Sequence, residues 1–319
     1  MKIKTIFMGT PEFAVPILEA LIKSDFIEVI STVCNQDKLV GRKQILTPPP
    51  TKILAEKYNI PVLQPDKIRK PEWTEKIKEL NPELIVVAAF GQIIPKTILD
   101  IPKYKAINVH GSLLPKLRGA SPVQFAILEG YEKTGVTIMI MDELMDHGPI
   151  LSQKKIKIEP KETSKTLFEK MAKIGASLLI ETISKWISGQ LKVTEQNHDE
   201  MTLTKILSKE DGKINWQNSA EKIERQIRAF NIWPGTFCFF KDRDGKERRL
   251  KILEADITVC ANKKLKDYGF LFTDGKNNLF VKTGKDCLKL TKIQPEGKNQ
   301  INATGFIGGY SFLINKILK

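Results

Sequence analysis

The chain of 319 residues has few cysteines and no long apolar run. Cys34, Cys238, Cys260 and Cys287 form no C-x-x-C pair, which argues against a zinc ribbon or a disulfide framework and favours free, inert thiols. No run reaches the roughly 18 apolar residues that a membrane-spanning helix needs. The amino terminus also lacks the longer apolar stretch of a secretory signal. We therefore expect a cytoplasmic protein that does not contact a membrane.

Motifs for the common nucleotide cofactors are missing as well. Gly9-Thr10-Pro11 follows the first predicted strand but lacks the second and third glycines of the dinucleotide fingerprint, and no P-loop motif occurs. No group of His and Cys residues has the spacing of metal ligands. The sequence thus argues against a nicotinamide cofactor, P-loop chemistry and a bound metal.

The apolar content and the charge distribution suggest two domains. Apolar residues make up 41% of the chain, which is ample for a core in each of two domains. The net charge is +14, of which residues 206–319 carry +9 and residues 1–205 carry +5. A basic domain is typical of a protein with a polyanionic partner such as nucleic acid. A lysine-rich proteome would produce the same excess, so charge alone leaves this partner open.

Strand and helix patterns alternate through the first half. The residues at 84–90 form a continuous apolar run, which is typical of a parallel strand buried on both faces. The alternation predicts an α/β fold with a Rossmann-like, mostly parallel sheet, whose ligands bind at the carboxyl ends of the strands. The predicted strands are 2–8, 28–34, 84–90, 106–110, 135–141 and 149–158, and the predicted helices are 11–22, 51–58, 122–129 and 163–187.

The pattern changes near residue 190. Residues 190–205 are polar and weakly patterned, which indicates a linker. After it, one predicted helix at 219–230 precedes five short predicted strands, separated by turn signals such as Asp244-Gly245. Five strands at this spacing favour a small, OB-like antiparallel β-barrel. We therefore predict a first domain over 1–189, a linker over 190–205 and a basic barrel domain over 206–319.

Two polar clusters follow predicted strands and are candidates for chemistry. Asn108 and His110 lie two residues apart at a strand end, so both side chains leave the same face. An amide and an imidazole side by side can donate hydrogen bonds to a developing oxyanion. Asp146, which follows the strand at 135–141, is a candidate for orienting His110. Polar residues at strand ends more often serve turns, and spacing alone does not decide between these interpretations.

Both clusters belong to a longer pattern. The chain reads Asn108-x-His110-Gly111-Ser112-Leu113-Leu114-Pro115, then Arg118-Gly119-x-x-Pro122, then Asp142-x-x-x-Asp146-x-Gly148. This pattern resembles the formyl transferase family that uses 10-formyltetrahydrofolate. The stretches at 8–16, 88–95, 208–214 and 228–236 extend the resemblance over nearly the full length. The last two are similar to the second domain of the members that act on tRNA.

The resemblance implies an activity, its partners and its site residues. The implied reaction moves a formyl group from 10-formyltetrahydrofolate to the α-amino group of methionine on initiator methionyl-tRNA. The tRNA and the folate co-substrate are thus the expected partners, and we expect a monomer. The implied residues are Asn108, His110 and Asp146 for catalysis; Ser112, Leu113, Leu114, Pro115, Phe90, Gly91, Gln92 and Ile93 for the folate; and Arg42 and Lys43, in the polar segment 35–50, for the tRNA.

Three other interpretations remain open at this point. In the first, the acceptor of the formyl group is a small amine such as an amino sugar nucleotide. The segment 35–50 and the basic second domain argue against this interpretation. A hydrolase would use Ser112, His110 and Asp146 as a triad, but the G-x-S-x-G motif is absent. A non-catalytic RNA-binding module would fit the charge but leaves the Asn108, His110 and Asp146 set without a purpose.

Overall fold

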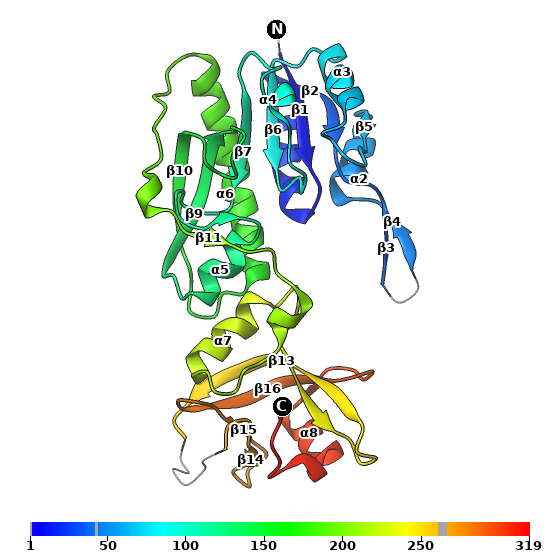
Figure 1. Cartoon of the computed structure of the whole chain (residues 1–319), viewed down its shortest axis with the longest axis vertical. Helices are drawn as coiled ribbons and strands as arrows, with labels where there is room; N and C mark the ends of the chain where they lie inside the picture. Colours follow the sequence, from blue (N-terminus) through cyan, green and yellow to red (C-terminus); the bar gives the residue numbers. More distant parts are fainter. Residues whose placement is uncertain (1, 42–43, 261–266) are drawn as a thin grey trace. The chain divides into compact units, whose positions relative to one another are not determined.

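The computed structural model describes residues 2–41, 44–260 and 267–319, which form two compact units (Figure 1). The first unit comprises the ranges 1–122, 133–157 and 168–204, and the second comprises 123–132, 158–167 and 205–319. Two short segments of the first half are thus grouped with the second unit. Among the helices in the described ranges, none has an apolar stretch that would span a membrane. The domain ranges 1–189 and 206–319 stay a prediction.

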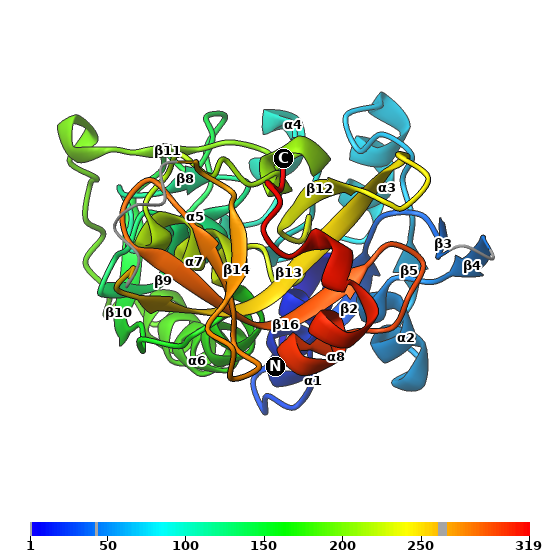
Figure 2. The same ribbon diagram turned by 90° about the horizontal axis from the view of Figure 1, so that it is seen from below.

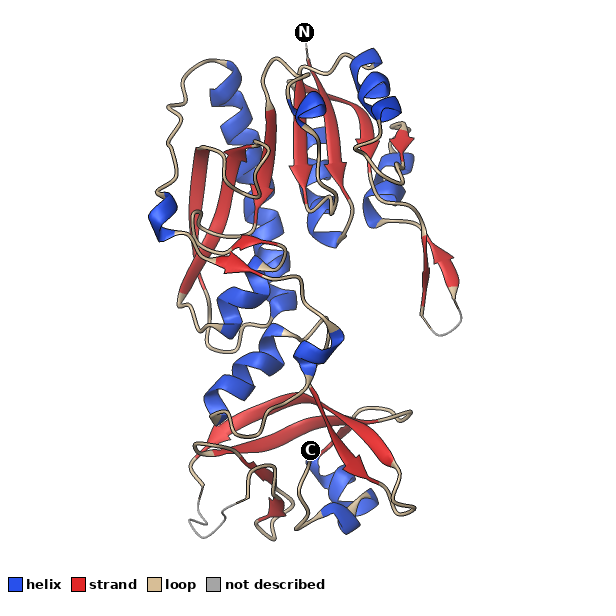
Figure 3. Ribbon diagram, viewed as in Figure 1, coloured by secondary structure: helices blue, strands red, loops and turns tan. Residues whose placement is uncertain are grey.

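A seven-stranded sheet forms the centre of the first unit (Figure 3). The strands from β7 to β5 run parallel, whereas β9 is antiparallel to β7 and β10 is antiparallel to β9. The prediction of a mostly parallel sheet is confirmed. The order across the sheet is β10 (Ile150–Lys157), β9 (Lys133–Ile140), β7 (Ala106–His110), β6 (Leu84–Ala88), β1 (Ile3–Gly9), β2 (Ile27–Val33) and β5 (Val62–Leu63).

Helices pack on both faces of this sheet. Ile77 of α3 and Ile98 of α4 join a buried cluster with Met8 and Val87 on one face. The helices of the first half are η1 (Glu12–Ala14), α1 (Val15–Ile22), α2 (Pro50–Lys57), α3 (Pro71–Glu79), α4 (Lys96–Leu99), α5 (Pro122–Leu128) and α6 (Ser164–Ile187).

The packing of α6 determines which face of β7 is left for other contacts. Gly175 of α6 lies so close to the sheet that a Cβ there would be 3.1 Å from Val109 Cγ1 and 3.3 Å from Val136 Cγ1. Because side chains alternate along a strand, Asn108 and His110 point to the opposite face. That face is the one that α3 and α4 share, since Asn108 is in register with Val87 of β6.

The segment 35–50, predicted to be a polar loop, contains a short β-hairpin instead. Strands β3 (Lys38–Val40) and β4 (Ile45–Thr47) pair in antiparallel register, and the hairpin projects from the body of the first unit (Figure 1). Leu39, Val40, Ile45 and Leu46 are each more than half exposed. The β-branched residues Val40, Ile45 and Thr47 favour these strands. The strands were not predicted because charged and polar residues surround them in the sequence. Arg42 and Lys43 lie outside the described residues.

The second unit is built on an antiparallel sheet. Its strands pair in the order β12 (Phe237–Lys241), β13 (Glu247–Thr258), β16 (Cys287–Pro295), β15 (Leu279–Lys282) and β14 (Leu271–Thr273), with β17 (Ile301–Asn302) beside β16. The core between the strands and the helices α7 (Ala220–Ala229) and α8 (Ala303–Gly309) contains Leu250, Leu290, Ile223 and Phe306. Figure 2 shows α8 lying close to β16. Short 3₁₀ helices occur at η3 (Lys209–Gly212) and η4 (Ser311–Leu313) in this unit, and at η2 (His198–Glu200) in the first unit.

The carboxyl-terminal residues close this sheet into a barrel. On one side, the amide of Leu271 donates to the carbonyl of Lys316 at 2.9 Å, and the amide of Leu318 donates to the carbonyl of Gly269 at 2.9 Å. On the other side, Lys319 and Phe239 exchange hydrogen bonds of 2.9 and 2.6 Å. The last residues therefore bridge the two edge strands, β14 and β12. The prediction of an OB-like antiparallel barrel is confirmed.

The cysteines differ from expectation in one respect. Cys260 and Cys287 are joined by a disulfide with a Cα–Cα distance of 5.1 Å, so the prediction of four free thiols is wrong for this pair. The two residues are 27 positions apart, and only the fold brings them together. Cys34 and Cys238 are free and buried, as expected. Burial raises the pKa of the Cys34 thiol to about 11, and it also raises the pKa of the Cys238 thiol, so both stay protonated at neutral pH.

Candidate active site

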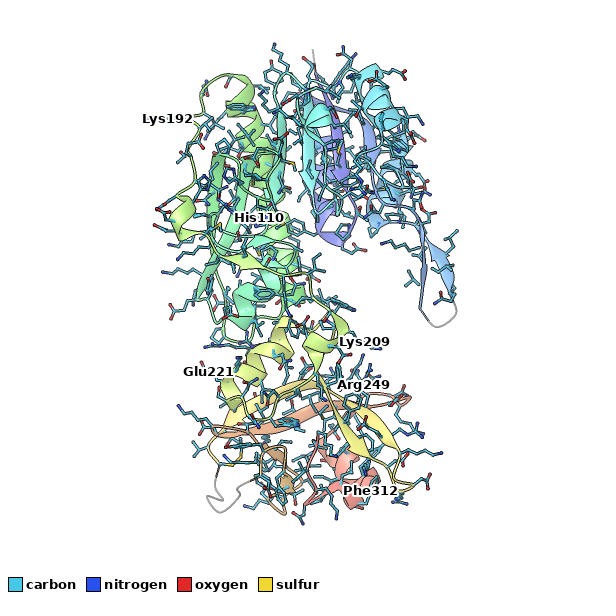
Figure 4. The ribbon with its side chains drawn as sticks, viewed as in Figure 1. His110, Lys192, Lys209, Glu221, Arg249 and Phe312 are labelled. Atoms are coloured by element: carbon cyan, nitrogen blue, oxygen red, sulfur yellow. A yellow bond between two sulfur atoms is a disulfide. The ribbon has the colours of Figure 1, made fainter. Side chains whose placement is uncertain are left out.

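Asn108, His110 and Asp146 converge on one face of β7 (Figure 4 labels His110). The His110 and Asn108 side chains are buried there. His110 Nδ1 lies 3.4 Å from Asp146 Oδ1, and Asn108 Nδ2 lies 3.5 Å from the same oxygen. The structure therefore brings together the amide, the imidazole and the carboxylate that the sequence analysis singled out.

The contacts of the His110 ring suit its doubly protonated form. Nε2 lies 3.1 Å from the carbonyl oxygen of Leu117, while Nδ1 faces the carboxylate of Asp146. A neutral imidazole carries only one N–H, so one nitrogen would meet an oxygen acceptor without a proton between them. An imidazolium would supply an N–H to each contact. The neighbouring Asn108 amide is a donor that can stabilise developing negative charge.

Asp146 reaches His110 by a route that the order of strands does not suggest. Ile140 of β9 pairs with Ile107, and Met141 donates to the carbonyl of Ala106, so β9 ends beside the start of β7. The two polar clusters thus follow the ends of two neighbouring strands that run in opposite directions, so they begin at opposite ends of this strand pair. The loop 141–149 folds back along β7 and brings the Asp146 carboxylate to the ring.

The backbone around Asp146 is held in an uncommon conformation. Asp146 has a φ of +50°, in the left-handed region that non-glycine residues seldom adopt. Its Oδ2 accepts a hydrogen bond of 2.7 Å from the amide of Gly119. The carboxylate therefore connects the loop 141–149 to the segment after β7, where β8 (Arg118–Gly119) pairs in parallel with β11 (Leu203–Thr204).

The predicted folate loop, 112–115, follows β7 directly and is tightly bound to the neighbouring strands. The hydroxyl of Thr137 donates to the carbonyl of Ser112 at 2.6 Å, and the amide of Leu114 donates to that hydroxyl oxygen at 3.2 Å. The carbonyl of Leu114 accepts from Gln153 Nε2 at 2.9 Å. Leu113 is half-buried and Leu114 is buried. This loop thus presents a fixed backbone beside His110, and Pro115 ends it.

The residues after β6 that were predicted to bind the folate differ in what they contact. Phe90 is buried in the core, and Gly91 has a φ of +83°. The Gln92 amide donates to Asn35 Oδ1 at 2.9 Å and accepts from a backbone amide at 2.8 Å, so its polar atoms are engaged within the unit. Ile93 is 83% exposed. Ile93 is therefore the member of this set that offers free apolar surface.

The loop 141–149 offers further apolar surface near the same place. Leu144 and Met145 are each 62% exposed, although Asp146 follows them directly. Met141 packs against the buried cluster that contains Phe90 and Ile94, so this loop meets the segment after β6. Exposed apolar side chains in two adjoining loops are suited to a planar aromatic ligand.

Residues of the segment predicted to be a linker also lie at the site, although no sequence motif indicated them. Gln196 is 5% exposed, and its Oε1 accepts from Arg118 Nη2 at 2.7 Å. Arg118 is buried too, and its Nη2 lies 2.8 Å from His198 Nδ1. The His198 ring stacks on His147 at 4.2 Å between centroids. The sequence offered one signal. Arg118 belongs to the motif that carries the family resemblance, yet no acceptor for its guanidinium was predicted, and a guanidinium that becomes buried needs acceptors.

A separate pocket with a net positive lining, called the basic pocket below, lies entirely within the second unit. Its volume is about 610 Å³, and Phe239 and Phe312 line it together with four cations and two carboxylates, Lys241, Arg243, Lys316, Lys319, Asp242 and Glu247. The guanidinium of Arg243 lies 5.2 Å from the centre of the Phe312 ring, which is labelled in Figure 4. Stacked aromatic rings and cations are the groups that bind nucleotides in OB-like barrels. Within the described ranges, no group of three His, Cys, Asp or Glu side chains is placed to hold a metal ion.

Comparisons with known proteins identify relatives over nearly the whole chain. A family model described as "Formyl transferase" matches residues 1–183, and one described as "Formyl transferase, C-terminal domain" matches residues 206–311. A relative from Desulfotalea psychrophila named methionyl-tRNA formyltransferase is 43% identical over 99% of this chain and 96% of its own. A protein of the same name from Bacillus cytotoxicus is 42% identical over 96% of both chains.

A solved structure shares the fold at lower sequence identity. It is WlaRD, a sugar 3N-formyl transferase crystallised in the presence of dTDP and 5-N-formyl-THF. The TM-score is 0.62 and the identity 22%, over 94% of this chain and all of WlaRD. At this identity the likeness concerns the fold alone.

We expect Gly148→Ala to destabilise the protein through the loop that carries Asp146. A Cβ at Gly148 would lie 2.1 Å from the carbonyl oxygen of Ile140, in backbone that β9 holds in place. Overpacking of this kind costs about 1–3 kcal/mol, measurable as a lower free energy of unfolding in urea. Gly308→Ala in α8 is the control, because a Cβ there meets nothing within 4 Å and alanine favours a helix by about 0.5–1 kcal/mol. Equal stability of Gly148→Ala and the wild type would contradict the close packing.

Proposed function

The chain belongs to the formyl transferase family, and from this premise we infer that it is an enzyme that formylates the α-amino group of methionine on initiator methionyl-tRNA, with 10-formyltetrahydrofolate as donor. The observation that carries this proposal is identity of 42–43% to proteins named methionyl-tRNA formyltransferase over nearly the whole chain. The match includes the barrel unit as well as the unit that holds His110. The product would serve translation initiation.

An amino sugar nucleotide as acceptor is the weaker alternative. WlaRD, which acts on a sugar according to its description, is 22% identical to this chain. The tRNA-directed relatives share about twice that identity. The basic pocket of the second unit adds a reason to favour a polyanionic substrate.

The geometry around His110 supports a direct attack of the amine on the formyl carbon. A free α-amino group has a pKa of about 7.7–8.0, so an unprotonated fraction exists near neutral pH. Negative charge develops on the formyl oxygen as the new C–N bond forms. Asn108 would donate to that oxygen, and the positive charge of a protonated His110, whose two N–H groups face Leu117 and Asp146, would stabilise it electrostatically. The amine must then lose a proton, and the leaving N10 must gain one. Asp146, which faces His110 Nδ1 at 3.4 Å, is the base in position to relay it.

We propose that the folate binds where the loops after β6, β7 and β9 meet. Ile93, Leu144 and Met145 would contact the planar pterin through their exposed side chains. The fixed backbone of the loop 112–115 would bind along its edge. The folate supplies the activated formyl group when bound, and the chain's part is to orient it and to stabilise charge.

We propose residues 1–189 as the catalytic domain and 206–319 as a tRNA-binding domain. Lys241, Arg243, Lys316 and Lys319 around the second unit's pocket support phosphate contacts. Arg42 and Lys43, between the strands of the β3–β4 hairpin, are proposed to contact the acceptor stem. Because charged tRNA is used where translation occurs, we place the enzyme in the cytoplasm. A monomer stays a prediction.

The proposal is tested by mixing the protein with 10-formyltetrahydrofolate and methionine-charged initiator tRNA. We expect formylmethionyl-tRNA and tetrahydrofolate to appear in equal amounts, and only when both substrates are present. Uncharged tRNA is the control. Formylation of an amino sugar nucleotide in place of the charged tRNA would contradict the proposal and support the alternative.

Single substitutions at the candidate catalytic residues should slow the transfer without unfolding the protein. We expect Asn108→Ala, His110→Ala and Asp146→Ala each to lower the single-turnover rate by about 10²–10³, the usual cost of removing one oxyanion donor or its support. Glu143→Ala is a matched control, because Glu143 is exposed in the same loop as Asp146. Rates near that of the wild type for all three variants would exclude this assignment.

Binding of tRNA should weaken as the salt concentration rises. Cations around the second unit's pocket displace counterions from the phosphates, and the release of these counterions favours binding less when the salt concentration is high. Lys241→Ala and Arg243→Ala should each reduce the slope of log K against log salt by about 1 if each side chain contacts one phosphate. Lys222→Ala, exposed on α7, removes the same charge outside the pocket lining and is the control. Fluorescence titrations at several salt concentrations measure this. Identical slopes for all three variants and the wild type would argue against the pocket.

A further inference from the structure

We propose that Gln196 is a positioning residue for formyl transfer, acting through the backbone that carries Asp146. This inference rests on the proposed function and deepens it. Gln196 belongs to the segment 194–204, which we call the strap. The strap was predicted to be a linker, but in the structure it binds both loops that surround His110.

The amide of Gln196 makes four hydrogen bonds in two directions. Its Nε2 donates to the carbonyl of Asp146 at 3.0 Å and to that of Gly148 at 2.7 Å. Its Oε1 accepts from Arg118 Nε at 3.2 Å and from Arg118 Nη2 at 2.7 Å. Both polar atoms of a buried side chain are therefore used. One amide thus connects the loop 141–149 to the segment that follows the predicted folate loop.

Other residues of the strap hold the same two loops. Thr194 and Ile150 exchange backbone hydrogen bonds of 2.8 and 2.9 Å at the end of the loop 141–149. On the other side, Thr202 Oγ1 accepts from the amide of Leu117 at 2.8 Å, and Thr204 Oγ1 donates to the carbonyl of Arg118 at 3.0 Å. Gln196 lies between these anchors in sequence, and its side chain hydrogen-bonds to both loops, while His198 contacts both through Arg118 and His147.

Two residues next to His110 have left-handed backbone and depend on such contacts. Asp146 has a φ of +50° and Leu117 a φ of +59°. Strained backbone persists only where the surrounding structure holds it in place. The carbonyl of Asp146 is held by Gln196, and the amide of Leu117 is held by Thr202. Both residues direct an oxygen at the His110 ring, so the strap determines the positions of both acceptors.

The substitution Gln196→Glu removes one half of these contacts and keeps the other. Glutamate has nearly the same shape and still accepts from Arg118, but an oxygen would replace the nitrogen that donates to Asp146 and Gly148. The two carbonyls would then face a carboxylate oxygen, and the loop 141–149 would shift. Displacement of a catalytic group by about 1 Å can cost on the order of 10² in rate. The residues proposed to bind tRNA contain none of these atoms, whereas Leu144 and Met145, which are proposed to contact the folate, lie in the loop that shifts.

Single-turnover kinetics with saturating folate and charged tRNA test this inference, because the amplitude reports the active fraction and the rate constant reports the chemistry. For Gln196→Glu and for the uncharged, similarly sized Gln196→Met, we expect rate constants about 10- to 100-fold below wild type. We also expect unchanged amplitudes and a KM for charged tRNA within about threefold of the wild type, because none of the proposed tRNA contacts lies in the loop that shifts. Glu195→Gln, at the exposed neighbouring position, should match the wild type.

Each other outcome has a defined meaning. Rate constants within twofold of wild type for both variants would overturn the inference. So would a loss confined to the amplitude, or the failure of both variants to fold, because either would mean that Gln196 serves stability alone. Absence of formyl transfer by the wild type would instead refute the proposed function, and the inference would fall with it.

Discussion

The carboxylate of Asp146 is the group on which the arrangement of the first unit's site depends. A carboxylate with a largely buried side chain requires donors, and it finds them in the amide of Gly119 and the ring of His110. These donors come from the segment after β7, whereas the carboxylate comes from the loop after β9. The contact therefore fixes two loops relative to each other, and the His110 ring is held between Asp146 and the carbonyl of Leu117.

The antiparallel direction of β9 explains why this contact needs outside support. Because β9 ends beside the start of β7, the loop 141–149 must return along the face of the sheet to reach His110. The opposite face is occupied by α6, whose Gly175 packs on Val109. The returning loop carries a left-handed residue, Asp146, and no regular structure of its own. The strap supplies the missing hydrogen-bond partners. It was predicted to be a linker, but these contacts give it a structural role that a free linker would lack.

The second unit combines a closed barrel with a pocket of a different chemical character. Its carboxyl-terminal residues close the barrel by pairing with β14 and β12, and the same residues help to line the pocket. One of the cations there, Arg243, lies over the ring of Phe312. Held in this way, its charge needs less ordering when it meets a phosphate. The sequence shows only that this unit is basic. The fold gathers four of its cations around one pocket.

The sequence by itself determined the elements whose pattern is local. The predicted strands at 84–90 and 106–110 match β6 and β7 closely. The motif around His110 also named the three side chains, Asn108, His110 and Asp146, that lie together in the structure. The sequence did not determine the direction of β9, the pairing of β3 with β4, the disulfide between Cys260 and Cys287, or the burial of Gln196. Hydrophobic periodicity reports only whether a segment has a buried face. Which distant residues satisfy a buried polar group depends on hydrogen bonds between segments far apart in the chain, and those are decided only when the tertiary structure forms.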